Sequence, residues 1–150
     1  MLESDALRRV LFLLPDYSQR ESARLFRACY RLIETLLREG ISVILDATNL
    51  AERYRVELYH IADKTNAKLI LVRVTAPPSL VRTRLEARIK TPGARSDADW
   101  EVYKAMKPTV ERIVRWHFTV DTSRDIAPVI EKIVKEAENV AQTSPFEKGR

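Results

Sequence analysis

Asp5 and Arg8 are the first pair of side chains whose types and spacing could carry chemistry. A helix through this segment places them one turn apart on one face. In that arrangement the carboxylate can take a proton from a hydroxyl group while the guanidinium orients an anionic substrate. A solvated surface ion pair explains the same spacing. The spacing alone leaves both interpretations open.

A second group of polar residues, Asp46-Ala47-Thr48-Asn49, follows the apolar, strand-like residues 41–45. A carboxylate at the end of a parallel strand can hold a water molecule bound to magnesium, which makes Asp46 the candidate metal residue. Thr48 and Asn49 can contact a phosphate or cap the next helix. Asp and Asn are also common turn residues, so a purely structural turn is the alternative.

Arginines form a third group. Arg84 and Arg88 are four positions apart, and Arg95 follows in a loop marked by Pro92-Gly93. Like charges at this helical spacing repel each other unless an anion lies between them. A mobile arginine-rich segment over a nucleotide can stabilise the charge on a transferring phosphoryl group. The alternative is an ordinary solvated helix face.

Periodicity and capping residues predict the elements that position these side chains. A capping box at Ser18 and Glu21 and a terminal Gly40 predict one long helix. Buried strands are predicted over residues 41–45, 68–74 and 118–120. Further helices are predicted over residues 4–13, 51–65 and 78–89, from about residue 97 with Ser96 as its cap, and from about residue 125.

Strands that alternate with helices predict an α/β fold with a mostly parallel sheet, flanked by helices. Asp46 and Asp121 each end a predicted strand, which places both at or near the carboxyl edge of the sheet, where ligands bind. We expect one domain over residues 1–141 and a frayed tail over residues 142–150.

Composition excludes several classes of protein. The chain has 150 residues, of which 45% are hydrophobic, enough for one domain with a real core. A single cysteine excludes a disulfide framework and a Cys-rich zinc site, and two histidines leave little for a His-based metal site. No apolar run approaches membrane-spanning length, and the N-terminus has no signal-like core, so we expect a cytoplasmic location and no membrane partner.

The net charge of +5 is unevenly distributed. Residues 81–115 hold nine basic and five acidic side chains, a larger excess than elsewhere in the chain. This concentration favours a local anionic ligand over a nucleic-acid binder that uses the whole surface.

The order of these motifs resembles a family. Five features follow one another over about residues 2–137: Ser-Asp-x-x-Arg, a long helix, Asp-Ala-Thr-Asn after a strand, Arg-x-Arg-Leu-x-x-x-Arg, and Val120-Asp121-Thr122-Ser123. The set resembles the small kinases of the P-loop superfamily, the AAA-domain-like group related to polynucleotide kinase and zeta toxin. The resemblance implies a three-layer P-loop NTPase fold, ATP and Mg²⁺ as cofactors, and a hydroxyl-bearing acceptor that is a small molecule or a nucleic-acid end.

The resemblance also implies roles for individual residues. Asp5 would be the base for the substrate hydroxyl and Arg8 a substrate contact. Asp46 would lie at the second acidic strand end, with Thr48 and Asn49 beside the phosphates. Arg84 and Arg88 would be catalytic arginines of the lid that also contact the nucleotide, and Asp121 would lie near the adenine.

One hallmark of that family does not occur in the sequence. None of the three glycines belongs to a phosphate-binding loop of the form G-x-x-x-x-G-K-S/T. We therefore expect an incomplete, N-terminally truncated fold that binds ATP and Mg²⁺ poorly and is inactive alone. The strand before that loop lies mid-sheet in related kinases. Its absence predicts that the strands at 41–46 and 68–74 are either close together or left with unpaired edges.

Three functions remain. The first is a phosphotransferase that moves the γ-phosphoryl of ATP to a hydroxyl group in its complete form. The second is a non-catalytic relic that binds an anionic ligand through its basic lid. The third is a nucleic-acid binder that uses the same stretch, for which residues 81–115 offer little aromatic interleaving. The sequence leaves the oligomeric state open.

Overall fold

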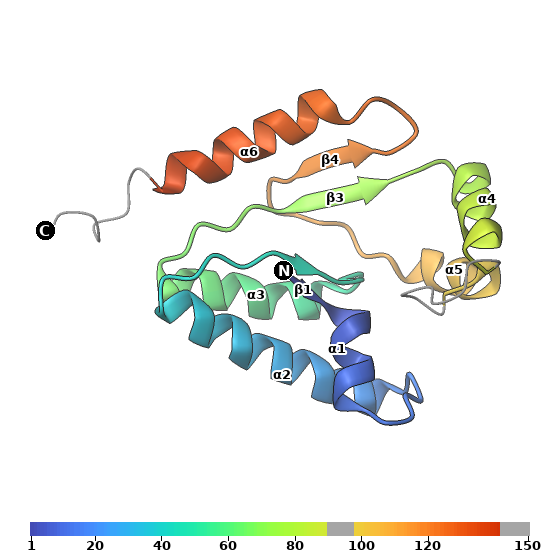
Figure 1. Ribbon diagram of the computed structural model, residues 1–150, viewed down its shortest axis with the longest axis horizontal. Coiled ribbons are helices and arrows are strands. Elements are labelled where there is room, and N and C mark those ends of the chain that lie inside the picture. Colours follow the sequence, from blue (N-terminus) through green and yellow to red (C-terminus); the bar gives the residue numbers. More distant parts are fainter. Residues whose placement is uncertain (90–97, 142–150) are drawn as a thin grey trace, which may run out of the picture.

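A computed structural model of the chain describes residues 1–89 and 98–141. Short strands alternate with helices along it (Figure 1). In chain order the elements are β1 (Leu2–Glu3), α1 (Ser4–Leu11), α2 (Gln19–Arg38), β2 (Leu45–Asp46), α3 (Glu52–Thr65), β3 (Val72–Thr75), α4 (Pro78–Ile89), α5 (Trp100–Met106), the 3-10 helix η1 (Lys107–Thr109), β4 (Phe118–Asp121) and α6 (Ala127–Ala141). Both strand pairs are parallel, which confirms the predicted α/β class.

The first strand pair fixes the N-terminus against the middle of the chain. β1 pairs with β2, with Leu2 opposite Leu45 and Glu3 opposite Asp46. The amide of Leu2 also donates to the carbonyl oxygen of Ile44 at 2.8 Å. Because the strands are parallel, α1 and the loop after β2 begin at the same carboxyl edge.

The main core lies between α2 and α3. Apolar side chains of both helices are buried there: Leu25, Phe26, Cys29, Ile33, Tyr59, Ile61 and Ala62. The ring of Phe26 also stacks on that of Tyr54, with centroids 4.8 Å apart. Burial of a large apolar side chain contributes about 1.5–3 kcal/mol, so these helices form the most strongly stabilised part of the N-terminal half.

The start of α2 differs from the predicted capping box. The Oγ of Ser18 accepts a hydrogen bond from the amide of Glu21 at 3.1 Å, as predicted. The Glu21 carboxylate, however, accepts from the amides of Asp16 at 2.8 Å and Tyr17 at 3.2 Å, and the amide of Ser18 donates to Asp16 instead. At the other end Gly40, with φ of +74°, follows the helix in the left-handed conformation that glycine favours.

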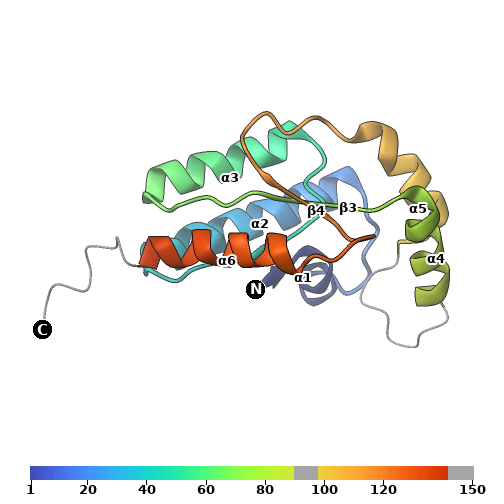
Figure 2. The same cartoon turned by 90° about the horizontal axis from the view of Figure 1, so that it is seen from above.

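The second strand pair carries the C-terminal half. β3 and β4 pair over four positions, from Val72 opposite Phe118 to Thr75 opposite Asp121. Val120 is buried, and α6 packs against β4. Figures 1 and 2 show α6 beside this pair, whereas α2 and α3 lie beside the first pair. Helices therefore flank the strands on both sides.

The two strand pairs do not join. Within the described residues β2 and β3 share no ladder, and each pair forms its own two-stranded sheet. The sequence analysis predicted that these strands would either lie close together or have unpaired edges, and the structure shows unpaired edges. Ile44 and Val74, beside these edges, are 68% and 67% exposed.

Several element boundaries differ from the predictions. Residues 41–44 and 68–71 belong to no strand, because they have no neighbouring strand to complete a ladder. The first helix ends at Leu11 rather than at residue 13, and Phe12 is already extended. Asp99 caps α5 by accepting from the amide of Val102 at 2.8 Å. The predicted cap Ser96 and the predicted tail, residues 142–150, lie outside the described residues.

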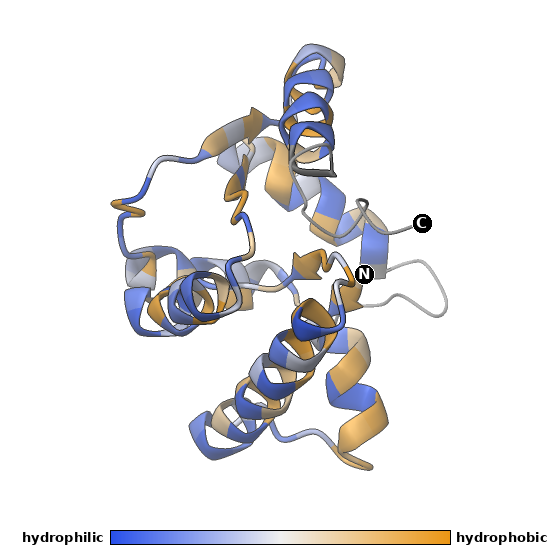
Figure 3. Ribbon diagram, turned by 90° about the vertical axis from the view of Figure 1, so that its left-hand side faces the viewer, coloured by the Kyte–Doolittle hydropathy of each residue, from blue (hydrophilic) through white to orange (hydrophobic). Residues whose placement is uncertain are grey.

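The distribution of hydrophobic residues differs between the strands and the helices. In Figure 3 the strands carry much of the hydrophobic colour, whereas the helices show both colours around their circumference. Among the described residues no helix has the length and apolar content needed to cross a membrane.

Candidate active site

The carboxyl ends of the strands define the candidate site. In Figure 1 the arrows of β3 and β4 point toward the side of the molecule where α4 and α5 lie, and β1 leads directly into α1. The structure thus brings the sequence-predicted residues to one end of the molecule, in two groups. Asp5, Asp46, Thr48 and Asn49 follow the first strand pair, and Arg84 with Asp121 follows the second.

Asp5 and Asp46 share the edge of the first pair. Glu3 lies opposite Asp46 in the ladder, and Asp5 comes two residues later in the first turn of α1. Neither Asp5 nor Asp46 has a side-chain hydrogen bond or ion pair to another described residue, so both carboxylates are available to a ligand. The described residues contain no group of three or more His, Cys, Asp or Glu suited to hold a metal ion.

Arg8 does not pair with Asp5. It is 7% exposed, and its Nη1 forms an ion pair with the Glu21 carboxylate. Its Nη2 donates to the Oγ of Ser22 at 3.2 Å, and its guanidinium lies 4.8 Å from the centroid of the Tyr17 ring. The pair therefore joins α1 to α2. The Nε of Arg8 is buried without a hydrogen-bond partner, so one nitrogen of the guanidinium makes no hydrogen bond.

The loop after β2 is a tight turn. The amides of Asn49 and Leu50 donate to the carbonyl oxygens of Ala47 and Thr48, each at 2.9 Å. The side chain of Thr48 is exposed, whereas the Oδ1 atom of Asn49 is buried and accepts no hydrogen bond. A buried acceptor of this kind is usually satisfied by a partner, which marks Asn49 as the residue of this loop most suited to contact a donor on a ligand.

Arg55 fixes this loop, and the sequence analysis did not single it out. The side chain is 4% exposed and donates to the carbonyl oxygens of Asn49 at 2.7 Å and Leu50 at 2.8 Å. It also donates to the carbonyl oxygens of Glu111 and Arg112, each at 3.1 Å. Its ion pair with Glu52, three positions earlier on α3, is the one signal visible in the sequence.

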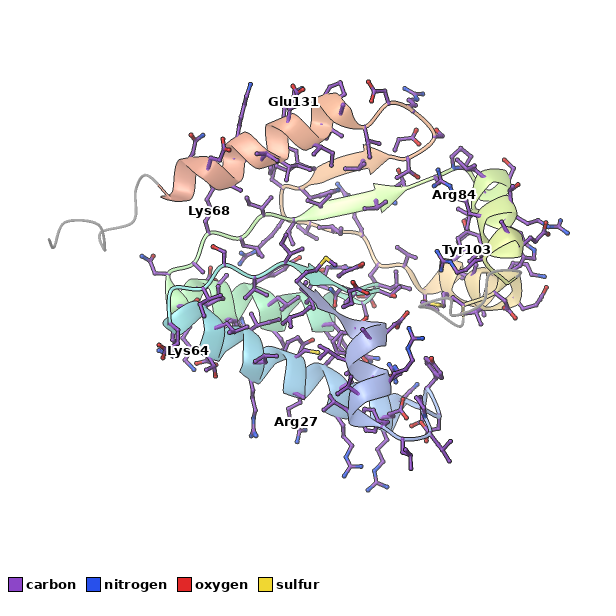
Figure 4. The ribbon with its side chains drawn as sticks, viewed as in Figure 1. Arg27, Lys64, Lys68, Arg84, Tyr103 and Glu131 are labelled. Carbon is purple, nitrogen blue, oxygen red and sulfur yellow. The ribbon has the colours of Figure 1, made fainter. Side chains whose placement is uncertain are left out.

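Arg84 clamps α4 to the end of the second strand pair. Its Nη1 donates to the Oγ1 of Thr122 at 2.6 Å and its Nη2 to the carbonyl oxygen of Thr122 at 2.8 Å. Thr122 in turn donates through Oγ1 to the carbonyl oxygen of Thr75 at 3.1 Å. Figure 4 shows Arg84 where β3 leads into α4, near Tyr103 of α5.

The other predicted arginines are placed differently. Arg88 is exposed, with no side-chain partner in the described ranges, so the two arginines do not act on one shared group here. Arg95 lies outside the described residues. Of the two arginines predicted for the lid, Arg84 is therefore anchored and Arg88 is solvated.

Asp121 has a local structural role. Its Oδ1 accepts hydrogen bonds from the amide of Ser123 at 3.0 Å and from the Oγ of Ser123 at 2.7 Å. These bonds, and more weakly the charge of Arg124, hold the pKa of the Asp121 carboxyl below its usual value. The carboxylate thus stabilises the turn that presents Thr122 to Arg84.

The residues present do not fit MgATP on their own. A P-loop binds the phosphates through backbone amides of a glycine-rich loop, a lysine and a hydroxyl, and that motif does not occur in the chain. The one glycine in the described ranges, Gly40, ends α2 and has open space around its Cα. Asp46, Asn49 and Arg84 supply single contacts rather than a phosphate cradle.

Comparison with known proteins agrees with this geometry. The family model described as an AAA domain (AAA_33) matches residues 1–113. Among solved structures, "a putative kinase" from Chloroflexus aurantiacus J-10-fl is similar, with a TM-score of 0.69 and 21% identity over 92% of this chain and 81% of that chain. No curated protein is similar enough to match. The fold is thus a kinase-like P-loop NTPase fold, and the chain belongs to the AAA domain family, within a P-loop kinase-like group.

Proposed function

We propose that this chain carries the acceptor side of an ATP-dependent phosphotransferase, which phosphorylates a hydroxyl group of a small molecule or of a nucleic-acid end. The parallel register of β1 and β2 carries the proposal, because it brings Asp5 to the same edge as Asp46. The family supports a kinase-like function with a nucleotide and a second substrate.

Asp5 is proposed as the catalytic base. Its carboxylate has no competing partner among the described residues, so it can accept the proton of an acceptor hydroxyl as the new bond to phosphorus forms. Arg8 is proposed to contact an anionic acceptor. Because Glu21 already neutralises its charge, that contact would come through Nε, the guanidinium nitrogen without a hydrogen-bond partner, rather than through a free guanidinium.

The arginines and the second loop are proposed to face the phosphates. Thr48 and Asn49 supply polar contacts at the first strand pair, and Arg84 and Arg88 supply positive charge at the second. When bound, MgATP would supply the transferable phosphoryl group and the metal charge. The residues of this chain account for the acceptor side of that transfer and not for the anchoring of ATP, with Asp46 the one candidate to approach the metal.

The proposal is tested by measuring phosphate transfer by the protein that the natural reading frame encodes. The nucleotides upstream of the Met1 codon should be sequenced and translated in frame, and any longer protein expressed beside the 150-residue chain. If a strand, the loop G-x-x-x-x-G-K-S/T and a helix are encoded there, the longer protein should transfer phosphate from ATP. The Asp5→Asn variant should then lose transfer by about two orders of magnitude or more while it retains ATP binding.

The control is Asp63→Asn, which removes a carboxylate on α3, exposed and distant in sequence from the strand ends. It should leave the rate unchanged. Full transfer by Asp5→Asn would refute the role of Asp5, and a stop codon upstream with no transfer by the chain would refute the phosphotransferase itself.

A non-catalytic relic is the second candidate. The observation that favours it is the engagement of Arg84 by Thr122, which leaves Arg88 as the solvated arginine of α4's last turn. In that case the chain should bind phosphate or nucleotide in a salt-sensitive way without turnover. Release of phosphate from ATP above background by the purified chain would contradict it.

A further inference from the structure

A second basic surface lies along the segment that leads into β4. A pocket of about 300 Å³ is formed by Arg73 near the start of β3 and by residues 112–117, which lead into β4. Figure 1 shows this segment entering β4 from the end that faces away from α4. None of the lining residues is one of the candidate active-site residues described above, but the pocket borders that site at Arg112, because Arg55 donates both to the carbonyl oxygen of Arg112 and to that of Asn49.

The pocket is strongly basic. Arg73, Arg112 and Arg115 contribute three guanidinium groups, His117 adds an imidazole, and no acidic side chain lines it. Arg115 is partly neutralised by Asp63 at 3.5 Å and lies 4.2 Å from the centroid of the Tyr59 ring. The guanidinium groups of Arg73 and Arg112 form no ion pair with other described residues, so they are available to an anion. Arginine binds phosphate oxygens with particular geometric fit.

The pocket also contains an exposed indole. Trp116 is 73% exposed, although a tryptophan normally buries most of its surface. Its ring contacts Phe118 edge to face, with centroids 4.6 Å apart and planes at 76°. This contact holds the indole in place while most of it stays open to solvent. An exposed aromatic ring beside arginines is a platform on which a nucleobase can stack.

The backbone around the pocket is held in place before any ligand binds. Arg55 donates to the carbonyl oxygens of Glu111 and Arg112, and the amide of Glu111 donates to the carbonyl oxygen of Leu50 at 2.9 Å. At the other end the amide of Phe118 donates to the carbonyl oxygen of Leu71 at 2.9 Å. A segment fixed at both ends loses little entropy when it binds a ligand.

We propose that this pocket binds single-stranded nucleic acid, with one base stacked on Trp116 and the adjoining phosphates held by Arg73 and Arg112. The exposure of the indole favours a strand over an enclosed mononucleotide, because a strand can continue past the pocket on both sides. The net charge of +5 favours association with a polyanion. The proposal concerns binding alone and does not depend on phosphotransfer.

Fluorescence of Trp116 tests the proposal directly. The chain has two tryptophans, so Trp100→Phe leaves Trp116 as the only reporter. This variant should be titrated at low salt with a single-stranded oligonucleotide of about 12 nucleotides, with AMP and with inorganic phosphate. The oligonucleotide should quench the indole and bind far more tightly than either small ligand, with affinity that falls as salt rises.

Substitutions locate the site. Trp116→Ala should weaken binding of the oligonucleotide about tenfold, measured by anisotropy of a labelled strand, and Trp116→Phe should restore part of that loss. Arg73→Ala and Arg112→Ala should each weaken binding and lower the salt dependence by about 0.7 in logarithmic slope. The matched control is Arg27→Ala, which removes the same charge from the outer side of α2 (Figure 4) and should leave affinity nearly unchanged.

Three results would overturn the proposal. The first is no binding of the oligonucleotide at low salt by the folded chain. The second is equal loss of affinity in Arg73→Ala and Arg27→Ala, which would indicate attraction to overall charge rather than to the pocket. The third is quenching by AMP at the same concentrations as the oligonucleotide, which would indicate a site for free nucleotides.

Discussion

Replacement of Arg55 by alanine is expected to be the most destabilising change to a charged residue of α3. The side chain forms an ion pair with Glu52 and donates to four backbone carbonyl oxygens, two after β2 and two in residues 111–112. A hydrogen bond to a charged group contributes about 1.5–3 kcal/mol. The sum of these hydrogen-bond contributions exceeds the net loss of stability on substitution, because the freed carbonyl groups bind water and both loops relax. We therefore expect a loss of about 3–4 kcal/mol in the free energy of unfolding.

Urea unfolding followed by far-UV circular dichroism measures this loss. With a slope of about 2 kcal/mol per molar urea, the midpoint should fall by roughly 1.5–2 M. Arg55→Lys should lie between the wild type and Arg55→Ala, because an ammonium group cannot reach both pairs of carbonyl oxygens. Arg53→Ala is the matched control, since Arg53 is exposed on the same helix and, among the described residues, its guanidinium interacts with Tyr54 alone. Equal midpoints for Arg55→Ala and Arg53→Ala would refute the reasoning.

Three further predictions concern other buried or hydrogen-bonded groups. Glu21→Gln should reduce the free energy of unfolding by about 3 kcal/mol, because it leaves the buried Arg8 without its counter-charge. The double variant Arg8→Met, Glu21→Gln should recover part of that free energy, as measured by urea unfolding. Hydrogen bonds from Ser123 lower the pKa of Asp121, so the contribution of this carboxylate to the free energy of unfolding should be complete above its unfolded-state pKa and lost as pH falls through the lower folded-state pKa. The loss of stability at acid pH should therefore be smaller in Asp121→Asn. Identical plots of stability against pH for the variant and the wild type would contradict this. Cys29 is 1% exposed, and its burial raises the pKa of its thiol. An aromatic disulfide reagent should therefore react with this thiol slowly in the native protein and rapidly in urea. Fast labelling of the native protein would show that the α2–α3 core opens.

Local sequence signals predicted the helices well. Ser18 and Gly40 bound α2 closely, because caps depend on residues within a turn of each other. The strands were predicted too long, since residues 41–44 have strand-like side chains but no partner along most of their length. Apolar composition indicates where a strand can form, whereas pairing with a distant segment decides how much of it does.

The candidate site was only partly visible in the sequence for a related reason. Asp46 and Asp121 could be placed at the carboxyl edge because each ends a predicted strand, and each ends a strand in the structure. Asp5 could not be placed there from the sequence, because no strand was predicted before it, and the pairing of β1 with β2 brings it to that edge. The partner of Arg8 could not be predicted from helical spacing, because Glu21 lies on another helix, 13 positions away. Arg55 was missed because most of its partners are carbonyl groups, which every residue has and no sequence pattern marks.

The open edges of β2 and β3 have a consequence for handling the protein in solution. An unpaired edge displays backbone donors and acceptors in the spacing of a strand, and here the neighbouring Ile44 and Val74 side chains are mostly exposed. Such an edge is a template for strands from other molecules. The yield of monomer should therefore fall steeply with protein concentration, and a charged residue at either position should keep the chain in solution at concentrations where the wild type precipitates.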